Sequence, residues 1–331
     1  MKASTKKNNL LVCLAALSAV MVFLTSMACL SEAASYPEQD VTFIVPFRPG
    51  GGLDAQARIL APFIKKYLPN KVNVVIENQP AAGGKVGALK VFQAKPNGYT
   101  IGILSPNSMA LLNAKGEIGK TKLGDLTYLC RTTYAPYMLT LSSRSQFKNI
   151  SEMKGQRVKF GGTTAVVFQA AMIAQQLGVK MVFVTYDGFP ESSMAAMRGD
   201  VDVTFFNWDS GIKHVEASEG KLKTIFIASE SRLAELPNLP TAKEAGLALD
   251  RDVMSVMAAH NVVLAPAGLP PAVKGVLEKA VQKAINDPEL VAQMRKANYF
   301  VKTLTPKETR EYVQGIAALY MKYKDMIETV K

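Results

Sequence analysis

The chain has 331 residues, of which 48% are hydrophobic and 20% charged, and its formal net charge is +12 at pH 7. These are ordinary values for a globular protein of about two domains. The lysines and arginines are scattered and form no basic run interleaved with aromatic residues, which argues against a nucleic-acid-binding protein. The charge instead favours a small anion or an acidic surface as the partner.

The first 33 residues have the pattern of a secretory signal peptide. Three lysines precede the apolar run LLVCLAALSAVMVFL, and small residues follow it. The run is too short for a stable membrane span, so we expect cleavage after Ala33 and export to the periplasm. Lipid attachment at Cys29 is the alternative, although a lipoprotein signal usually has a branched apolar residue at the position of Ser26.

The mature chain lacks the residues of this signal. Removal of residues 1–33 deletes three lysines and one glutamate, so the net charge becomes +10. Cys130 is then the one remaining cysteine, so no intramolecular disulfide can form, and a buried structural thiol is its expected role. No later segment reaches about 18 consecutive apolar residues, so we expect a soluble mature protein.

Short apolar runs alternate with helical periods from residue 41 onward. In the first expected helix, Ile59, Leu60, Phe63, Ile64 and Tyr67 recur at spacings of three and four, which gives the helix one apolar face. Strands that alternate with helices predict a parallel sheet covered on both faces. The expected elements are strand 41–45, helix 55–67, strand 72–77, helix 86–94 and strand 99–104.

A second series of the same plan begins near residue 157, after the less regular stretch 130–155. A late strand and three helical segments then close the chain, and the late strand needs a sheet to join. We therefore expect the chain to return to the first unit, where the late strand can join its sheet. This gives two α/β lobes joined by crossings near residues 130–140 and 250–260. The expected division is signal peptide 1–33, lobe 1 over 34–135 and 256–331, and lobe 2 over 136–255. The expected elements are strand 157–160, helix 165–178, strand 181–186, helix 192–199, strands 201–206, 222–229 and 261–265, and helices 272–286, 288–298 and 306–330.

The stretch IVPFRPGGGLDAQARIL, residues 44–60, places a glycine-rich turn between an expected strand and an expected helix. Free backbone N–H groups at the start of such a helix favour a phosphate or a carboxylate. Alternatively, Gly50, Gly51 and Gly52 only allow positive φ in a tight turn. Asp54 is placed to cap the helix by accepting from a backbone N–H two or three residues further on.

Two nucleotide-binding motifs are absent from this turn. A P-loop requires Gly-Lys followed by Ser or Thr, whereas the turn continues Gly-Leu-Asp. A dinucleotide fingerprint spaces its glycines as G-x-G-x-x-G, and residues 50–55 do not have that spacing. Arg48, just before the glycines, either holds a carboxylate bidentately or is a solvated surface arginine.

Four further loops follow an expected strand and precede an expected helix, and in parallel sheets such loops face one cleft. They supply hydroxyl, amide and aromatic groups suited to a polar organic ligand, although helix capping is the competing role for the serines and threonines. These loop residues are Ser105, Asn107, Ser108, Thr163, Thr164, Tyr186, Asn207 and the only tryptophan, Trp208.

Catalytic and metal sites have little support in the sequence. The two histidines, His214 and His260, form no metal-binding spacing and no nucleophile motif. We therefore expect no metal, no cofactor and no enzymatic activity. An exported hydrolase or isomerase acting in the same cleft is the alternative, because the sequence does not exclude paired acids of the glycosidase type.

Several long segments are similar to one family of transport receptors. They are YPEQDVTFIVPFRPGGGLDAQARILAPFI, VVIENQPAAGGKVGALKVFQAKPNGYTIGIL, GDVDVTF, LPNLPTAKEAG and VLAPAGLPPAVKGVLEKAVQKAINDPEL. In order and spacing, the chain resembles the solute-binding receptors of tripartite tricarboxylate transporters, the Bug family, over nearly all of its mature length. The resemblance implies a two-lobed periplasmic binding protein (Venus flytrap, type II-like) with two α/β domains and a ligand cleft between them.

In this family the ligand, usually a small carboxylate, is held by backbone amides and ordered waters at one loop of each lobe. For this chain the resemblance implies loops 46–54 and 161–164, with residues 81–84 and the loops after Leu104 and Phe205 lining the rest. It implies a monomer that delivers a small organic anion to the membrane permease subunits of a tripartite transporter. A ligand-sensing ectodomain of a signalling system is the alternative, because its two lobes would close on a ligand in the same way.

The chain departs from the family's usual residues at three points. It has Arg48 where small neutral residues are common, Asp187 where a lysine is common, and His260 in the region where an aromatic residue usually precedes LAPAG. The first two exchanges either move the charge that fixes the ligand between the lobes or accommodate a cationic group beside the ligand's carboxylate. The residues that we expect to contact the ligand are Pro46, Phe47, Arg48, Gly50, Gly51, Gly52, Asp54, Ala82, Gly83, Ser105, Asn107, Ser108, Gly161, Gly162, Thr163, Thr164, Tyr186, Asp187, Asn207 and Trp208.

Overall fold

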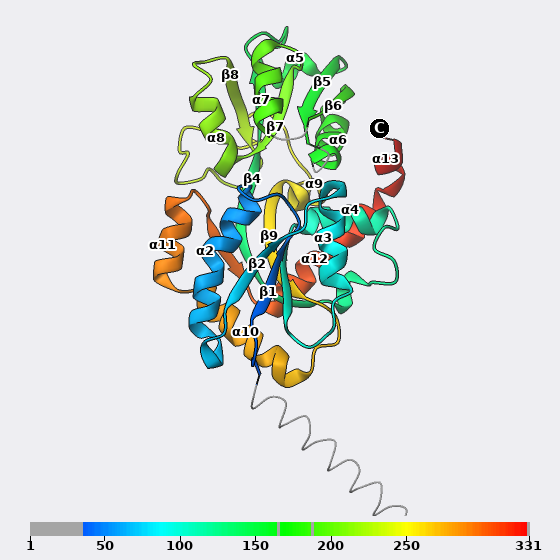
Figure 1. Ribbon diagram of the computed structural model, residues 1–331. Coiled ribbons are helices and arrows are strands. Elements are labelled where there is room, and N and C mark those ends of the chain that lie inside the picture. The colour runs from blue at the N-terminus through cyan, green and yellow to red at the C-terminus, as the bar shows by residue number, and fades with distance from the viewer. Residues whose placement is uncertain (1–35, 164–165, 187–188, 330–331) are drawn as a thin grey trace, which may run out of the picture.

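The computed structural model describes residues 36–163, 166–186 and 189–329. Figure 1 shows two lobes, of which we call the lower one in that view lobe 1 and the upper one lobe 2. The expected signal peptide, Thr164 and Asp187 lie outside the described residues. Within these ranges, no helix is both long enough and apolar enough to cross a bilayer.

Lobe 1 is built on a mixed sheet, not on the fully parallel sheet that we expected. Its strands are β1 (Val41–Val45), β2 (Val74–Asn78), β3 (Thr100–Leu104), β9 (Ala258–Ala265), β10 (Val301–Leu304) and the first part of β4 (Thr127–Ser142). Their order is β2-β1-β3-β9-β4, and β10 also pairs with β4. The first three strands are parallel, whereas β9 is antiparallel to β3 and β4 because the chain re-enters lobe 1 in the opposite direction.

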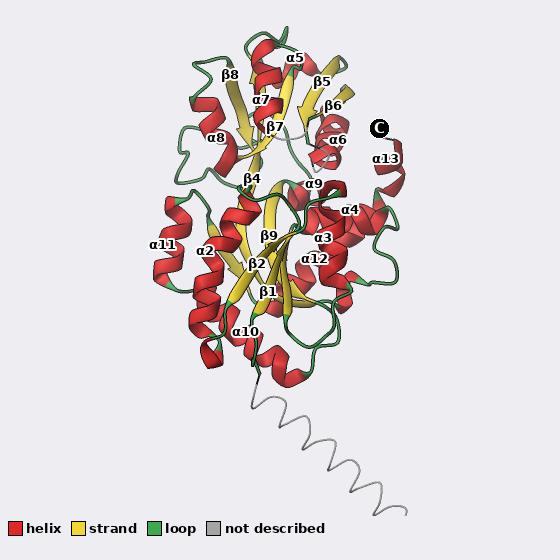
Figure 2. Cartoon of the chain, viewed as in Figure 1, coloured by secondary structure: helices red, strands yellow, loops and turns green. Residues whose placement is uncertain are grey.

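Helices cover both faces of this sheet (Figure 2). Since alternate strand residues point to opposite faces, Phe43 and Val45 pack with α2 (Gly52–Tyr67) and α10 (Pro271–Ile285). Ile44 packs on the other face with α3 (Lys85–Phe92) and α4 (Pro106–Ala114). The remaining elements of the lobe are α11 (Pro288–Lys296), α12 (Pro306–Lys322), α13 (Lys324–Thr329) and the 3₁₀ turns Pro69–Lys71, Ala82–Gly84 and Leu123–Asp125.

Lobe 2 repeats the strand and helix alternation on the second part of β4. Its elements are α5 (Ile150–Met153), β5 (Arg157–Gly162), α6 (Val167–Leu177), β6 (Lys180–Thr185), α7 (Phe189–Arg198), β7 (Val203–Asn207), α8 (Trp208–Glu216) and β8 (Leu222–Ile227), and α9 (Arg251–Val256) leads back to lobe 1. Strand β5 is parallel to β6 and β7, whereas β7 and β8 are antiparallel to β4. The expected strands and helices of this series are confirmed, with ends shifted by a few residues.

The largest difference from our expectation is β4, a strand of 16 residues in a stretch that looked irregular. Residues 127–136 pair with β9 in lobe 1, and residues 137–142 pair with β7 and β8 in lobe 2. All of its residues but one are buried, so the strand has no exposed face and its sequence shows no alternation. One continuous strand therefore carries the chain from one lobe to the other.

The C-terminal helix α12 connects the lobes at a second place. Thr305 and Glu308 form a capping box at its start, which satisfies the first N–H groups of the helix. Near its end, the Tyr320 ring lies 4.1 Å from the ring of Phe168 in α6. The Gln169 Nε2 donates a hydrogen bond of 3.1 Å to the Tyr320 hydroxyl. The helix thus begins in lobe 1 and ends against lobe 2.

Candidate ligand-binding site

The glycine-rich turn between β1 and α2 is held in place by Asp54. The buried carboxylate accepts hydrogen bonds from the Gly50 backbone N–H (2.8 Å), from Arg58 Nε (2.8 Å) and from Asn78 Nδ2 (2.9 Å). Asn78 also donates to the Phe47 carbonyl oxygen (2.9 Å). The hydrogen bond from Arg58 is the main reason that the pKa of Asp54 is lowered to about 2. A buried, ionised carboxylate therefore determines the shape of the turn.

The capping role that we expected for Asp54 is wrong. Helix α2 begins at Gly52, earlier than expected, and Gly51 occupies the N-cap without a side-chain hydrogen bond. Asp54 lies in the first helical turn, and its side chain points back to Gly50, whose φ of +85° favours glycine. The N–H groups of Gly52 and Leu53 find no acceptor among the described residues, so they are available to an anion.

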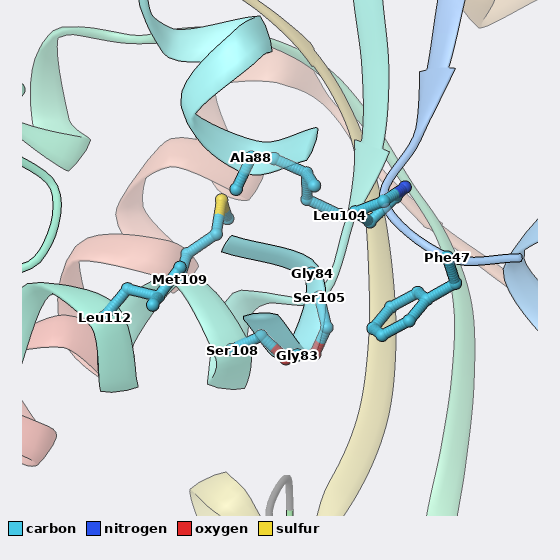
Figure 3. A pocket seen from close by; sticks show the side chains of 10 residues that line it. Phe47, Gly83, Gly84, Ala88, Leu104, Ser105, Ser108, Met109 and Leu112 are labelled. Atoms are coloured by element: carbon cyan, nitrogen blue, oxygen red, sulfur yellow. The ribbon is translucent and has the colours of Figure 1, made fainter. Parts of the chain in front are cut away.

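A small apolar pocket lies beside this turn, between α3 and α4 (Figure 3). In that view the Phe47 ring stands on one side, and Met109 and Leu112 stand on the other. A Cβ atom on Gly84 would lie 3.1 Å from Phe47 Cζ, so any larger residue would push the ring outward, and the φ of +92° at Gly84 also favours glycine. The cavity volume is about 10 Å³, enough for about one water molecule. The lining residues are Pro46, Phe47, Gly83, Gly84, Ala88, Leu104, Ser105, Ser108, Met109 and Leu112.

Two serine hydroxyls give this pocket its polar groups. Ser105 is the N-cap of α4, but its side chain makes no cap hydrogen bond. Neither its hydroxyl nor that of Ser108 has a hydrogen-bond partner among the described residues. Both side chains are partly exposed and line the pocket. The expected competing role, helix capping, is therefore not observed for Ser105.

The other expected residues of lobe 1 have different positions. Arg48 is exposed at the turn. Ala82 has a positive φ of 46° in the 3₁₀ turn before α3. Asn107 is buried, donates from Nδ2 to the Ala258 carbonyl oxygen (3.1 Å), and leaves its Oδ1 without a hydrogen-bond partner. Asn107 therefore connects α4 to the start of β9 and does not line the pocket.

In lobe 2 the expected residues lie at the ends of three neighbouring strands. Gly161 and Gly162 end β5 and are buried, and Thr163 follows them. The Tyr186 N–H donates to the Gly162 carbonyl oxygen (2.9 Å). The Tyr186 ring packs near Gly161, since a Cβ atom on that glycine would lie 3.3 Å from the ring. These residues share one end of the sheet, but none of them lines the lobe 1 pocket.

Asn207 and Trp208 differ in their surroundings although they are neighbours. Asn207 ends β7, and its Nδ2 donates to the Asp209 carboxylate. Trp208 begins α8 and is 5% exposed. Its ring lies 4.1 Å from the ring of Phe300 in lobe 1, so the tryptophan packs at the junction of the lobes.

The remaining reactive side chains have structural surroundings. His260 is buried against Tyr134 and Tyr312, and burial, with Arg131 nearby, holds its pKa well below the usual value. Cys130 is buried as expected, and burial raises the pKa of its thiol to about 12. Within the described ranges, no group of three or more His, Cys, Asp or Glu side chains is placed to hold a metal ion.

Four pocket residues were not among those expected from the sequence, whereas Gly84 belongs to the segment 81–84 that the resemblance implied. The signal that could have identified part of the set is the helical spacing of Met109 and Leu112 directly after the expected loop residue Ser108. The four residues are Ala88, Leu104, Met109 and Leu112.

Comparisons with known proteins agree over most of the chain. Residues 57–331 match the family described as TctC, tripartite tricarboxylate transporter family receptor. Protein BugT of Bordetella pertussis is 24% identical over 312 residues, which cover 91% of this chain and 93% of that protein. A UPF0065 protein of Cupriavidus necator is 26% identical over 317 residues, which cover 92% of this chain and 91% of that protein.

Solved structures share the fold. MatC of Rhodopseudomonas palustris with bound malate superposes with a TM-score of 0.70 at 24% identity, covering 88% of this chain and 100% of that chain. The Rpa4515 protein of R. palustris with adipate superposes with a TM-score of 0.72 at 22% identity, covering 88% of this chain and 98% of that chain. The predicted two-lobed α/β binding-protein fold is confirmed.

Proposed function

Because the chain belongs to the tripartite tricarboxylate transporter receptor family, we propose that it is an exported receptor that captures a small organic carboxylate in the cleft between its lobes. We further propose that it delivers this ligand to the membrane permease subunits of a tripartite transporter. The family is one of solute-binding receptors, which favours a binding role over catalysis. The signal-like residues 1–33 support export.

The observation that carries the proposal is the combination of free backbone amides and an apolar pocket at one place. The N–H groups of Gly52 and Leu53 lack acceptors among the described residues, and the start of a helix favours negative charge. The pocket beside them adds the two unpaired hydroxyls of Ser105 and Ser108 to apolar walls. The amides and hydroxyls suit a carboxylate group, and the apolar walls of the pocket, which has room for about one water molecule, favour an unhydroxylated carbon next to that group.

For the two lobes to close on the ligand, the ligand must bind the closed state, in which it contacts both lobes, more tightly than the open state, in which it contacts one. The ends of β5, β6 and β7 would supply the contacts of lobe 2, near Gly162, Tyr186 and Asn207. Arg48, exposed at the turn of lobe 1, would add a charge-assisted hydrogen bond to the ligand carboxylate. The two related structures that hold malate and adipate are consistent with this ligand class.

Native mass spectrometry of the freshly purified mature protein, followed by titration calorimetry, tests the proposal. We expect a retained mass that corresponds to a carboxylate. We also expect adipate to bind more tightly than galactarate, which has the same dicarboxylate skeleton but carries hydroxyl groups along it. A retained neutral sugar, or binding of sugars without binding of carboxylates, would overturn the proposed ligand class.

The rival functions give different results in the same material. An exported hydrolase or isomerase would convert the carboxylate, whereas a receptor binds it stoichiometrically without turnover. A sensing ectodomain would recover a signalling protein in a pull-down from membranes, whereas a transport receptor would recover permease subunits.

A further inference from the structure

Two adjacent aromatic residues, Tyr299 and Phe300, connect the glycine-rich turn to lobe 2. They lie between α11 and β10 and are half-buried. The Tyr299 hydroxyl donates a hydrogen bond to the Gly52 carbonyl oxygen (3.1 Å). Gly52 is the first residue of α2, so this bond attaches the segment to the turn that we propose to bind the ligand.

Phe300 makes the contact with the other lobe. Its ring lies 4.1 Å from the Trp208 ring, with an angle of 40° between the ring planes. Its carbonyl oxygen accepts from the Tyr134 N–H (3.2 Å) on β4, the strand that runs through both lobes. Trp208 is the first residue of α8 and directly follows Asn207 at the end of β7.

A charged residue in the first turn of α8 influences Tyr299. Burial raises the pKa of Tyr299, and the negative charge of Asp209, the residue after Trp208, raises it further. The Asp209 carboxylate also accepts from Asn207. The contact between the segment and α8 is the one that the Phe300 ring makes with Trp208.

We propose that Tyr299 and Phe300 couple the position of the glycine-rich turn to the first turn of α8, so that the two move together. Neighbouring residues share one short backbone segment, so a shift of Gly52 that pulls Tyr299 also displaces the Phe300 ring against Trp208. The coupling itself does not depend on the ligand, although its use in lobe closure rests on the proposed function. Both residues are positioning residues and need not touch the ligand.

The single tryptophan allows a ligand-free test, because the fluorescence of the mature chain then reports on Trp208 alone. Tyr299→Phe removes the bond to Gly52 and leaves the Phe300 ring in place. We expect it to increase acrylamide quenching of Trp208 by about twofold or more, as for a modest coupling between sites. Phe300→Leu should in turn speed the hydrogen exchange of the Gly50 and Ala55 amides, whose hydrogen bonds to Asp54 and to the Gly51 carbonyl oxygen hold the turn, by about twofold or more.

Tyr36→Phe is the matched control, because the Tyr36 hydroxyl also donates to a glycine carbonyl oxygen in lobe 1, that of Gly98 (2.7 Å). It should leave both the quenching of Trp208 and the hydrogen exchange of the Gly50 and Ala55 amides unchanged. Circular dichroism shows whether each variant is folded, and Phe300→Met replaces Phe300→Leu if the latter is not. The coupling is refuted if folded Tyr299→Phe leaves the quenching of Trp208 unchanged. It is also refuted if the folded variant at Phe300 leaves the hydrogen exchange of the turn unchanged. A failure of carboxylate binding would refute the proposed function without affecting this result.

Discussion

Replacing Asp54 with asparagine tests whether a buried carboxylate holds the glycine-rich turn. All three groups that it binds are donors: the Gly50 N–H, Arg58 Nε and Asn78 Nδ2. An amide at this position presents its own NH₂ group to at least one of them, so at least one donor loses its acceptor. We therefore expect Asp54→Asn to lower the free energy of unfolding and to loosen the turn.

The size of the effect follows from the pKa of the carboxyl. A pKa of about 2 for Asp54, against an ordinary value of 3.8, corresponds to about 2.5 kcal/mol of stability at neutral pH. The Arg58 side chain is 53% exposed, so solvent screens the pair, and we expect about 1 to 2 kcal/mol to be measured. Because the pKa is lowered on folding, this stabilisation is present above pH 3.8 and is lost as the pH falls toward 2. Urea unfolding at pH 7 and pH 3 should show the difference between wild type and variant shrinking by about half.

Asp287 provides a matched control in the same lobe. Its buried carboxylate accepts from Lys66 Nζ (2.8 Å) and from the Tyr67 hydroxyl (2.7 Å), and the hydrogen bond from Lys66 is the main reason that its pKa is also lowered to about 2. None of its hydrogen-bond partners belongs to the glycine-rich turn. Asp287→Asn should therefore lower stability with the same pH dependence but leave carboxylate affinity unchanged, whereas Asp54→Asn should weaken binding about tenfold.

Two results would contradict this reasoning. A stability difference for Asp54→Asn that is the same at pH 7 and pH 3 would show that its cost comes from packing and not from charge. Equal carboxylate affinities of the Asp54→Asn and Asp287→Asn variants would show that the turn does not take part in binding.

Three further substitutions and one reaction test other parts of the structure. Gly87→Ala would place a Cβ atom 2.6 Å from Pro46 Cα, so urea unfolding should show a loss of about 1 to 3 kcal/mol, whereas Gly275→Ala meets no atom within 4 Å and should add about 0.5 to 1 kcal/mol. Cys130, with a thiol pKa of about 12, should not react with Ellman's reagent at about pH 8 until the mature chain is unfolded. Arg48→Ala should weaken carboxylate binding by about 1.5 to 3 kcal/mol in calorimetry, and an unchanged affinity would remove Arg48 from the site.

The parts of the fold that were predictable from sequence are those set by local patterns. The strand expected at 41–45 is β1, and the one expected at 99–104 is β3, because each is a short apolar run bounded by turn residues. The loops after these strands lie together, as expected from the position of loops in parallel sheets, and both contribute residues to the pocket.

Strand β4 was not predictable for a physical reason. Its threonines are satisfied inside the sheet, as where the Thr132 hydroxyl donates to the Asn261 carbonyl oxygen (3.1 Å). Its Pro136 pairs with Ala258, next to the point where the strand passes from one sheet to the other. Polar residues and a proline in a buried strand look irregular until the partners are known, and those in β9 are more than 100 residues away.

The packing of Trp208 was also not predictable from the sequence, because its partner is distant in the chain. Its position after an expected strand indicated a ligand contact, and its burial against Phe300 depends on a residue far along the chain. No local pattern links the two rings. The ligand contacts expected from the sequence, that of Trp208 included, and the lobe boundaries at 135/136 and 255/256 stay predictions.

Asp54 lies in a turn that we propose to bind an anion, and its negative charge would repel the ligand if no cation balanced it. In this structure the charge of Asp54 is balanced by Arg58, and the oxygens of the carboxylate are occupied by Gly50 and Asn78. The Asp54 carboxylate accepts from the Gly50 N–H. The N–H groups of Gly52 and Leu53 at the start of α2 have no acceptor among the described residues and can donate to a ligand. Arg48 is exposed at the same turn, so its positive charge and the positive end of the helix both lie at this end of α2. The Asp54 and Arg58 pair thus shapes the turn without cancelling the positive potential on which carboxylate binding would depend.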